Sequence, residues 1–150
     1  TFLEGGHLMT AVKIEKGVAQ YIEHNLYYYF EYVCDIQRLK KDILFGRANY
    51  DENVGGGRGN LPSRPTERRT IELITHRRLE RLEQIVHAIK TVYRSLSPEK
   101  QKAVQLKYWS GKSYTWEQVA REIGVSVRQL YRWRDQIIYD IAKLLGEANS

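Results

Sequence analysis

The chain has 150 residues, of which 42% are hydrophobic and 28% are charged, and its formal net charge is +6. This length allows one compact domain or two small helical domains. The single cysteine excludes a disulfide framework within the chain, and no apolar run approaches the roughly 20 residues of a membrane-spanning helix, so we expect a protein of the reducing cytoplasm.

The first 45 residues predict a tag remnant followed by a helical hairpin. Residues 1–8 precede the only methionine, Met9, and their Gly-Gly-His content is typical of an expression tag, so Met9 is the expected native start. From 9 to 45, apolar residues recur at helical spacing with a break near Asn25. We expect Cys34 to be a small buried hydrophobe rather than a nucleophile.

Aromatic residues crowd the middle of this hairpin, at Tyr27, Tyr28, Tyr29, Phe30 and Tyr32. Aromatic platforms stack on the bases of single-stranded nucleic acid, but residues 1–46 carry five basic and six acidic groups and so lack a basic excess. Ordinary partial burial with exposed hydroxyls is the stronger interpretation, and an oligomer or interdomain surface also stays open.

Residues 46–65 predict a linker, because they are rich in glycine and end with two prolines. The glycines at 55–59 do not form a P-loop, since neither a Gly-Lys-Ser/Thr ending nor a preceding strand is present. Arg58 and Arg64 are candidates for contacts with a DNA backbone.

A long helix is expected from 66 to 96, with Thr66 as its cap after Pro65. Its apolar residues recur at alternating three and four positions: Leu82, Ile85, Ile89, Val92 and Leu96, with Ile71 and Ile74 before them. Such a stripe must be buried, either within the chain or against a second subunit. A homodimer through this helix or through the N-terminal hairpin is therefore open.

The last third of the chain predicts three helices, which makes the whole fold all-α. Ser97 caps the first helix, which Gly111 ends. Ser113 or Thr115 caps the second, from Trp116 to Ile123. This helix has the expected role of positioning the third.

Residues 97–150 are expected to form a helix-turn-helix domain that binds DNA. Gly124 stops the second helix in the left-handed conformation, and Val125 folds back as an apolar plug. Ser126 caps a third helix that runs to about Leu145. Its buried stripe consists of Val127, Leu130, Trp133, Ile137 and Ile138.

The polar face of this third helix suits the major groove of DNA. It carries Arg128, Gln129, Tyr131, Arg132 and Asp135, with Arg134 at its flank. Arginine bonds guanine, glutamine bonds adenine, and a tyrosine hydroxyl more often reaches a phosphate. The basic excess also lies after the glycines, because residues 60–96 hold eight basic and four acidic groups (+4) and residues 97–150 hold nine and six (+3).

The sequence offers no enzyme chemistry. The four histidines show no metal-ligand spacing with the cysteine, and His76 and His87 lie eleven positions apart on one expected helix. No serine or cysteine lies in a recognisable nucleophile motif. We expect no catalysis, no bound metal and no cofactor.

The motifs V-G-G-G-R-G-N-L-P-S-R-P-T and L-S-P-E-K-Q-K-A-V-Q-L-K-Y-W, on either side of the long helix, resemble the RinA/ArpU-type phage transcriptional regulators. From Leu96 onward the chain also resembles region 4 of bacterial sigma factors. The resemblance implies a small phage or prophage protein of the bacterial cytoplasm, associated with the nucleoid. It further implies activation of late genes by binding double-stranded promoter DNA in contact with host RNA polymerase.

The resemblance also implies roles for individual residues. Base reading falls to Val127, Arg128, Tyr131, Arg132 and Asp135. Ser126 lies at the start of the same helix. Apart from the resemblance, the residues expected to contact the DNA backbone are Ser126, Gln129, Arg134, Lys112, Thr115, Arg58 and Arg64.

Two other functions remain open. A phage small terminase subunit, which recognises DNA for packaging, also combines a helix-turn-helix with helical oligomerisation segments. A sigma-like adaptor would contact RNA polymerase without binding a specific DNA sequence.

Overall fold

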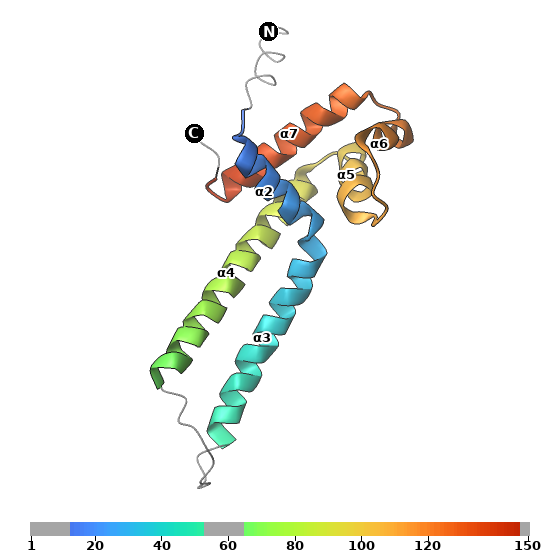
Figure 1. The fold of residues 1–150 in the computed structure, drawn as a ribbon. Coiled ribbons are helices and arrows are strands. Elements are labelled where there is room, and N and C mark those ends of the chain that lie inside the picture. Colours follow the sequence, from blue (N-terminus) through green and yellow to red (C-terminus); the bar gives the residue numbers. More distant parts are fainter. Residues whose placement is uncertain (1–12, 53–64, 148–150) are drawn as a thin grey trace. The chain divides into compact units, whose positions relative to one another are not determined.

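The computed structural model describes residues 13–52 and 65–147, and every element in these residues is helical (Figure 1). The elements are α2 (Lys16–Tyr27), α3 (Tyr29–Glu52), α4 (Pro65–Ser95), α5 (Pro98–Val104), the π-helix η1 (Gln105–Trp109), α6 (Trp116–Ile123) and α7 (Val127–Leu144). The predicted all-α fold is confirmed. In this part of the chain, no helix combines the length and the apolar character needed to cross a membrane.

The predictions for residues 1–8, Met9, Arg58 and Arg64 lie outside the described residues.

The chain divides into two compact units. Unit 1 comprises residues 1–29 and 87–150, and unit 2 comprises residues 30–86. The described part of unit 1 therefore holds α2, the end of α4, and all helices from α5 to α7. Unit 2 holds most of α3 and of α4.

The core of unit 1 is built on one face of α7. Ile138 and Ile141 of this helix are 2% and 0% exposed. Helix α2 packs against α7 and contributes Ile22 and Leu26, which are also fully buried. The apolar period of α7 thus determines which of its faces is turned away from the core.

The N-terminal hairpin predicted for residues 9–45 is wrong in its break and its grouping. Asn25 lies inside α2 and is 1% exposed, and the helix ends only at Tyr27. The next helix starts at Tyr29, so a single residue, Tyr28, separates the two. Helix α2 belongs to unit 1, because its apolar face is buried on α7.

The predicted linker is shorter than 46–65. Helix α3 continues through Gly46 to Glu52, since one glycine inside a helix costs only about 1 kcal/mol relative to alanine. Helix α4 begins at Pro65, a position that proline favours because the first helical amide needs no partner. Thr66 therefore lies within the first turn and is not the cap.

In unit 2, α3 and α4 run antiparallel, side by side (Figure 1). Two ion pairs link them: Lys40 Nζ lies 3.3 Å from Glu83 Oε1, and Arg78 Nη2 lies 3.9 Å from Asp35 Oδ2. No residue of α3 between 30 and 46 is buried. The prediction of a buried Cys34 is wrong, because within its unit α3 has a single neighbouring helix.

The predicted helix ends in unit 1 are confirmed. Ser97 caps α5 by accepting a hydrogen bond from the Lys100 amide. Of the two caps considered for α6, Thr115 is the one used, and it forms a reciprocal capping box with Gln118. Gly124 ends α6 with φ of 82°, a left-handed conformation that glycine adopts without a Cβ clash.

We predict that Gly124→Ala destabilises the protein by about 1–2 kcal/mol, because alanine is strained in the left-handed region. The matched control is Gly17→Ala in α2, where the glycine is helical and no atom lies within 4 Å of an added Cβ. This control should be neutral or stabilising by up to about 1 kcal/mol. Urea unfolding of both variants measures the difference, and equal effects would contradict the assigned turn.

Candidate nucleic-acid interface

Helices α6 and α7 form a helix-turn-helix around a small apolar cluster. Val119 and Ala120 of α6 pack with Leu130 of α7 and Ala103 of α5, and all four are at most 5% exposed. Val125, in the turn between the helices, is half-buried against this cluster, as the plug prediction required. The cluster fixes the N-terminal half of α7 relative to α6.

The face of α7 turned away from this cluster carries the candidate base-reading residues. Arg128 and Arg132 are one helical turn apart and both are exposed. Asp135 follows on the same face and is also exposed, and Tyr131 is 37% exposed. Two guanidinium groups on one exposed helix face suit bidentate bonding to guanine bases.

Val127 differs from the other four candidates, because it packs against the apolar cluster and is half-buried. Only part of its side chain is left at the surface. Its primary role in the structure is to pack the first turn of α7 on the helix-turn-helix core.

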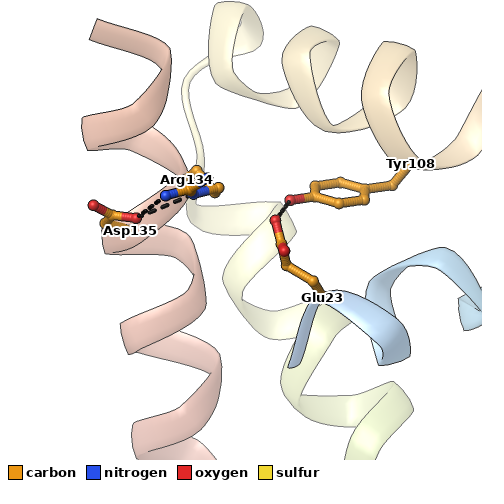
Figure 2. Close-up of polar contacts among 4 residues, drawn as sticks. All are labelled: Glu23, Tyr108, Arg134 and Asp135. Atoms are coloured by element: carbon orange, nitrogen blue, oxygen red, sulfur yellow. Dashed lines mark hydrogen bonds and ion pairs between the residues drawn. The ribbon is translucent and has the colours of Figure 1, made fainter. Parts of the chain in front are cut away.

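Arg134, Asp135 and Tyr131 are linked to one another at the flank of this face. The Nε and Nη2 atoms of Arg134 lie 3.1 and 3.0 Å from Asp135 Oδ1 (Figure 2). The Arg134 guanidinium also lies 4.9 Å from the centroid of the Tyr131 ring, which is a cation–π distance. Arg134 is therefore oriented by its neighbours, and Asp135 retains Oδ2 as a second acceptor.

The candidate backbone contacts lie at helix starts. Ser126 Oγ accepts a hydrogen bond from the Gln129 amide at 3.1 Å, and Thr115 Oγ1 accepts one from the Gln118 amide at 3.2 Å. Both hydroxyls keep a proton to donate to a phosphate oxygen. Gln129 is half-buried, whereas Lys112, shortly before α6, is exposed.

Two further lysines of unit 1 contact aromatic rings. Lys107 Nζ lies 5.3 Å from the Trp116 ring and donates to the Tyr114 carbonyl at 2.8 Å, and Lys100 Nζ lies 5.8 Å from the Trp133 ring. These cations are held in place by the protein itself, which favours Arg128, Arg132 and Lys112 as the more adaptable phosphate or base contacts.

Sequence reasoning missed the role of α2 in this region. The Tyr108 hydroxyl, from η1, donates to Glu23 Oε1 of α2 at 2.9 Å (Figure 2). The next residue, Trp109, donates from Nε1 to the Leu26 carbonyl at 2.9 Å. Adjacent residues thus both reach α2, and the wider π-turn of η1 makes this possible.

Aromatic rings add to the contact of η1 with α2 and the residues that follow it. The Tyr27 ring meets Tyr108 edge-on at 4.8 Å, and the Tyr29 ring stacks on Trp109 at 5.2 Å. The tyrosine-rich segment is thus partly used as packing surface within unit 1, the ordinary use of tyrosine.

Charge is unevenly divided between the two units. The described residues of unit 1, 13–29 and 87–147, carry thirteen basic and eight acidic side chains, a net charge of +5. The described residues of unit 2, 30–52 and 65–86, carry nine basic and nine acidic side chains and so have no net charge. The helix-turn-helix therefore lies in the more basic unit. Within the described residues, no group of three or more histidine, cysteine or acidic side chains has the arrangement of a metal site.

These features define an all-α protein with a helix-turn-helix in a basic unit. Residues 16–143 match the family described as "Protein of unknown function (DUF722)", and the chain belongs to that family. Comparisons with curated proteins and with solved structures found no match.

The hydrogen bond between Tyr108 and Glu23 makes the free energy of unfolding depend on pH in the alkaline range. Burial, followed by the nearby Glu23 carboxylate, raises the pKa of Tyr108 far above its ordinary value. The folded protein therefore keeps this proton, while the unfolded chain releases it near the ordinary pKa of about 10. Since the unfolded state then binds fewer protons, the free energy of unfolding falls as pH rises above about 10.

We predict that Tyr108→Phe makes this alkaline decline shallower by up to about 1.4 kcal/mol per pH unit, because the titrating group is gone. At neutral pH the same variant should lose about 1.5–3 kcal/mol, the contribution of a hydrogen bond to a charged group. Urea unfolding between about pH 8 and 11 measures both effects. Parallel pH profiles for wild type and variant would contradict the buried bond.

Proposed function

We propose that this protein is a sequence-specific DNA-binding transcriptional activator of phage or prophage late genes, working in the bacterial cytoplasm. The main support is the position of Arg128 and Arg132. They lie one turn apart on the exposed face of the second helix of a helix-turn-helix, within a unit whose described residues carry a net charge of +5. This is a binding role and involves no catalysis by the protein.

The late-gene part of the proposal and the contact with RNA polymerase depend on the resemblance to RinA/ArpU-type regulators and to sigma region 4. Genome-wide binding in the host distinguishes the candidate functions. One peak upstream of a late operon supports the activator, and peaks at packaging sites support a small terminase subunit. Occupancy that follows RNA polymerase across many genes supports a sigma-like adaptor.

We predict that Arg128→Ala and Arg132→Ala each weaken binding to a DNA duplex selected by the wild-type protein by about 1–3 kcal/mol. The reason is the loss of a bidentate contact with a base. Fluorescence anisotropy with the selected duplex and with a scrambled duplex separates lost specificity from lost affinity.

The matched control is Lys143→Ala, which removes an exposed cation in the last turn of the same helix. It should leave the preference for the selected duplex unchanged. If the double arginine variant binds that duplex as tightly as wild type, α7 does not read the bases.

Lys112 tests the backbone contacts separately. We predict that Lys112→Ala weakens binding to selected and scrambled duplexes alike and reduces the slope of log K against log salt by about 1. The cause is the loss of one phosphate contact and its released counterion. A titration series in NaCl measures the slope, and an unchanged slope would place Lys112 outside the interface.

A further inference from the structure

One apolar stripe of α4 changes from exposed to buried along the helix. Ile71 and Ile74 are 64% and 61% exposed, whereas Leu82, Ile85 and Ile89 are at most 8% exposed. The spacing of three and four keeps these residues on one side of the helix. The stripe is therefore covered in its later turns and open in its first turns.

The neighbouring end of α3 adds another apolar side chain to this open surface. Phe45 is 66% exposed and lies three positions after Asp42, on the same side of α3. The ion pair between Asp35 and Arg78 shows that this side of α3 adjoins the side of α4 that carries Ile71 and Ile74. We call Phe45, Ile71 and Ile74 the α4-side patch.

Charges of both signs surround the α4-side patch. Among the residues three or four positions from its members, Asp42 and Glu67 are acidic, and Lys41, Arg68, Arg77 and Arg78 are basic. Nucleic acid attracts a surface of one sign, whereas a mixed rim around an apolar centre is typical of a protein–protein contact. The absence of a net charge on the described residues of unit 2 agrees with this distinction.

The order of residues along α4 makes the surface complementary to itself. If two copies of α4 lie antiparallel with a two-fold axis midway between Ile71 and Ile74, Ile71 of each copy faces Ile74 of the other. The same axis brings Glu67 opposite Arg78, twice by symmetry. Apolar residues thus meet at the centre, and opposite charges meet at both ends.

We propose that two copies of this chain form a symmetric dimer through the α4-side patch, with antiparallel α4 helices pairing Ile71 with Ile74 and Glu67 with Arg78. The contact buries three large apolar side chains per copy that are otherwise more than 60% exposed. It does not depend on DNA binding, so it can hold or fail independently of the proposed function.

Sedimentation velocity of the full chain without DNA tests the dimer. We expect wild type to dimerise at concentrations up to about 100 μM, and the Ile71→Glu/Ile74→Glu variant to stay monomeric. The control is Leu144→Glu, which places the same charge at an apolar residue of α7 that is 55% exposed, and it should dimerise as wild type does. Circular dichroism confirms that each variant remains helical.

A charge swap tests the geometry. Glu67→Arg and Arg78→Glu should each weaken dimerisation by about tenfold or more, because each change places like charges opposite one another at two symmetric positions. The double variant should recover most of the loss. Since Arg78→Glu also removes the ion pair with Asp35 inside the chain, Asp35→Asn is its control and should dimerise as wild type does. A wild-type monomer, a ring of many subunits, or a dimer that survives the Ile71→Glu/Ile74→Glu change would each overturn the proposal, and so would a charge swap without rescue.

Discussion

The burial of one face of α7 is the interaction on which the rest of unit 1 depends. Leu130 is fixed in the helix-turn-helix cluster, and Ile138 and Ile141 are fixed in the core that α2 helps to form. Because an α-helix is stiff over 18 residues, anchoring both halves of its buried face sets the direction of its other face. Apolar packing on the buried face of α7 thus sets the direction in which Arg128 and Arg132 point. The two arginine side chains need no contacts within the protein for this.

Polar contacts between η1 and α2 add to this apolar packing. The Tyr108 hydroxyl satisfies the Glu23 carboxylate, and the Trp109 indole satisfies the Leu26 carbonyl, so η1 and α2 are joined by directional bonds as well as by packing. A buried hydroxyl without a partner would cost about 1–3 kcal/mol, which makes the pairing specific. The helix-turn-helix is therefore braced by a helix that lies about a hundred residues earlier in the chain.

Local features of this fold could be predicted from the sequence, and distant pairings could not. The caps Ser97, Thr115 and Ser126 and the left-handed Gly124 act on amides within a few residues, so their sequence neighbours define them. The partnership of α2 with α7 depends on contacts between distant segments, which no local pattern encodes. The predictions for Asn25 and Cys34 failed for the same reason, because the burial of Asn25 and the exposure of Cys34 depend on which distant helices pack against α2 and α3.

The different surfaces of the two units suggest a division of work. Under the proposed function, a single α7 would offer few side chains for base reading, and at about 1–3 kcal/mol for each good contact one copy would discriminate only modestly among genomic sites. A dimer joined through unit 2 would present two recognition helices at once and multiply their discrimination without any new base contact. The described residues of unit 2 have no net charge, which suits that role because a surface of mixed sign can pair with its own copy. The excess positive charge of unit 1 would then serve the proposed contact with DNA.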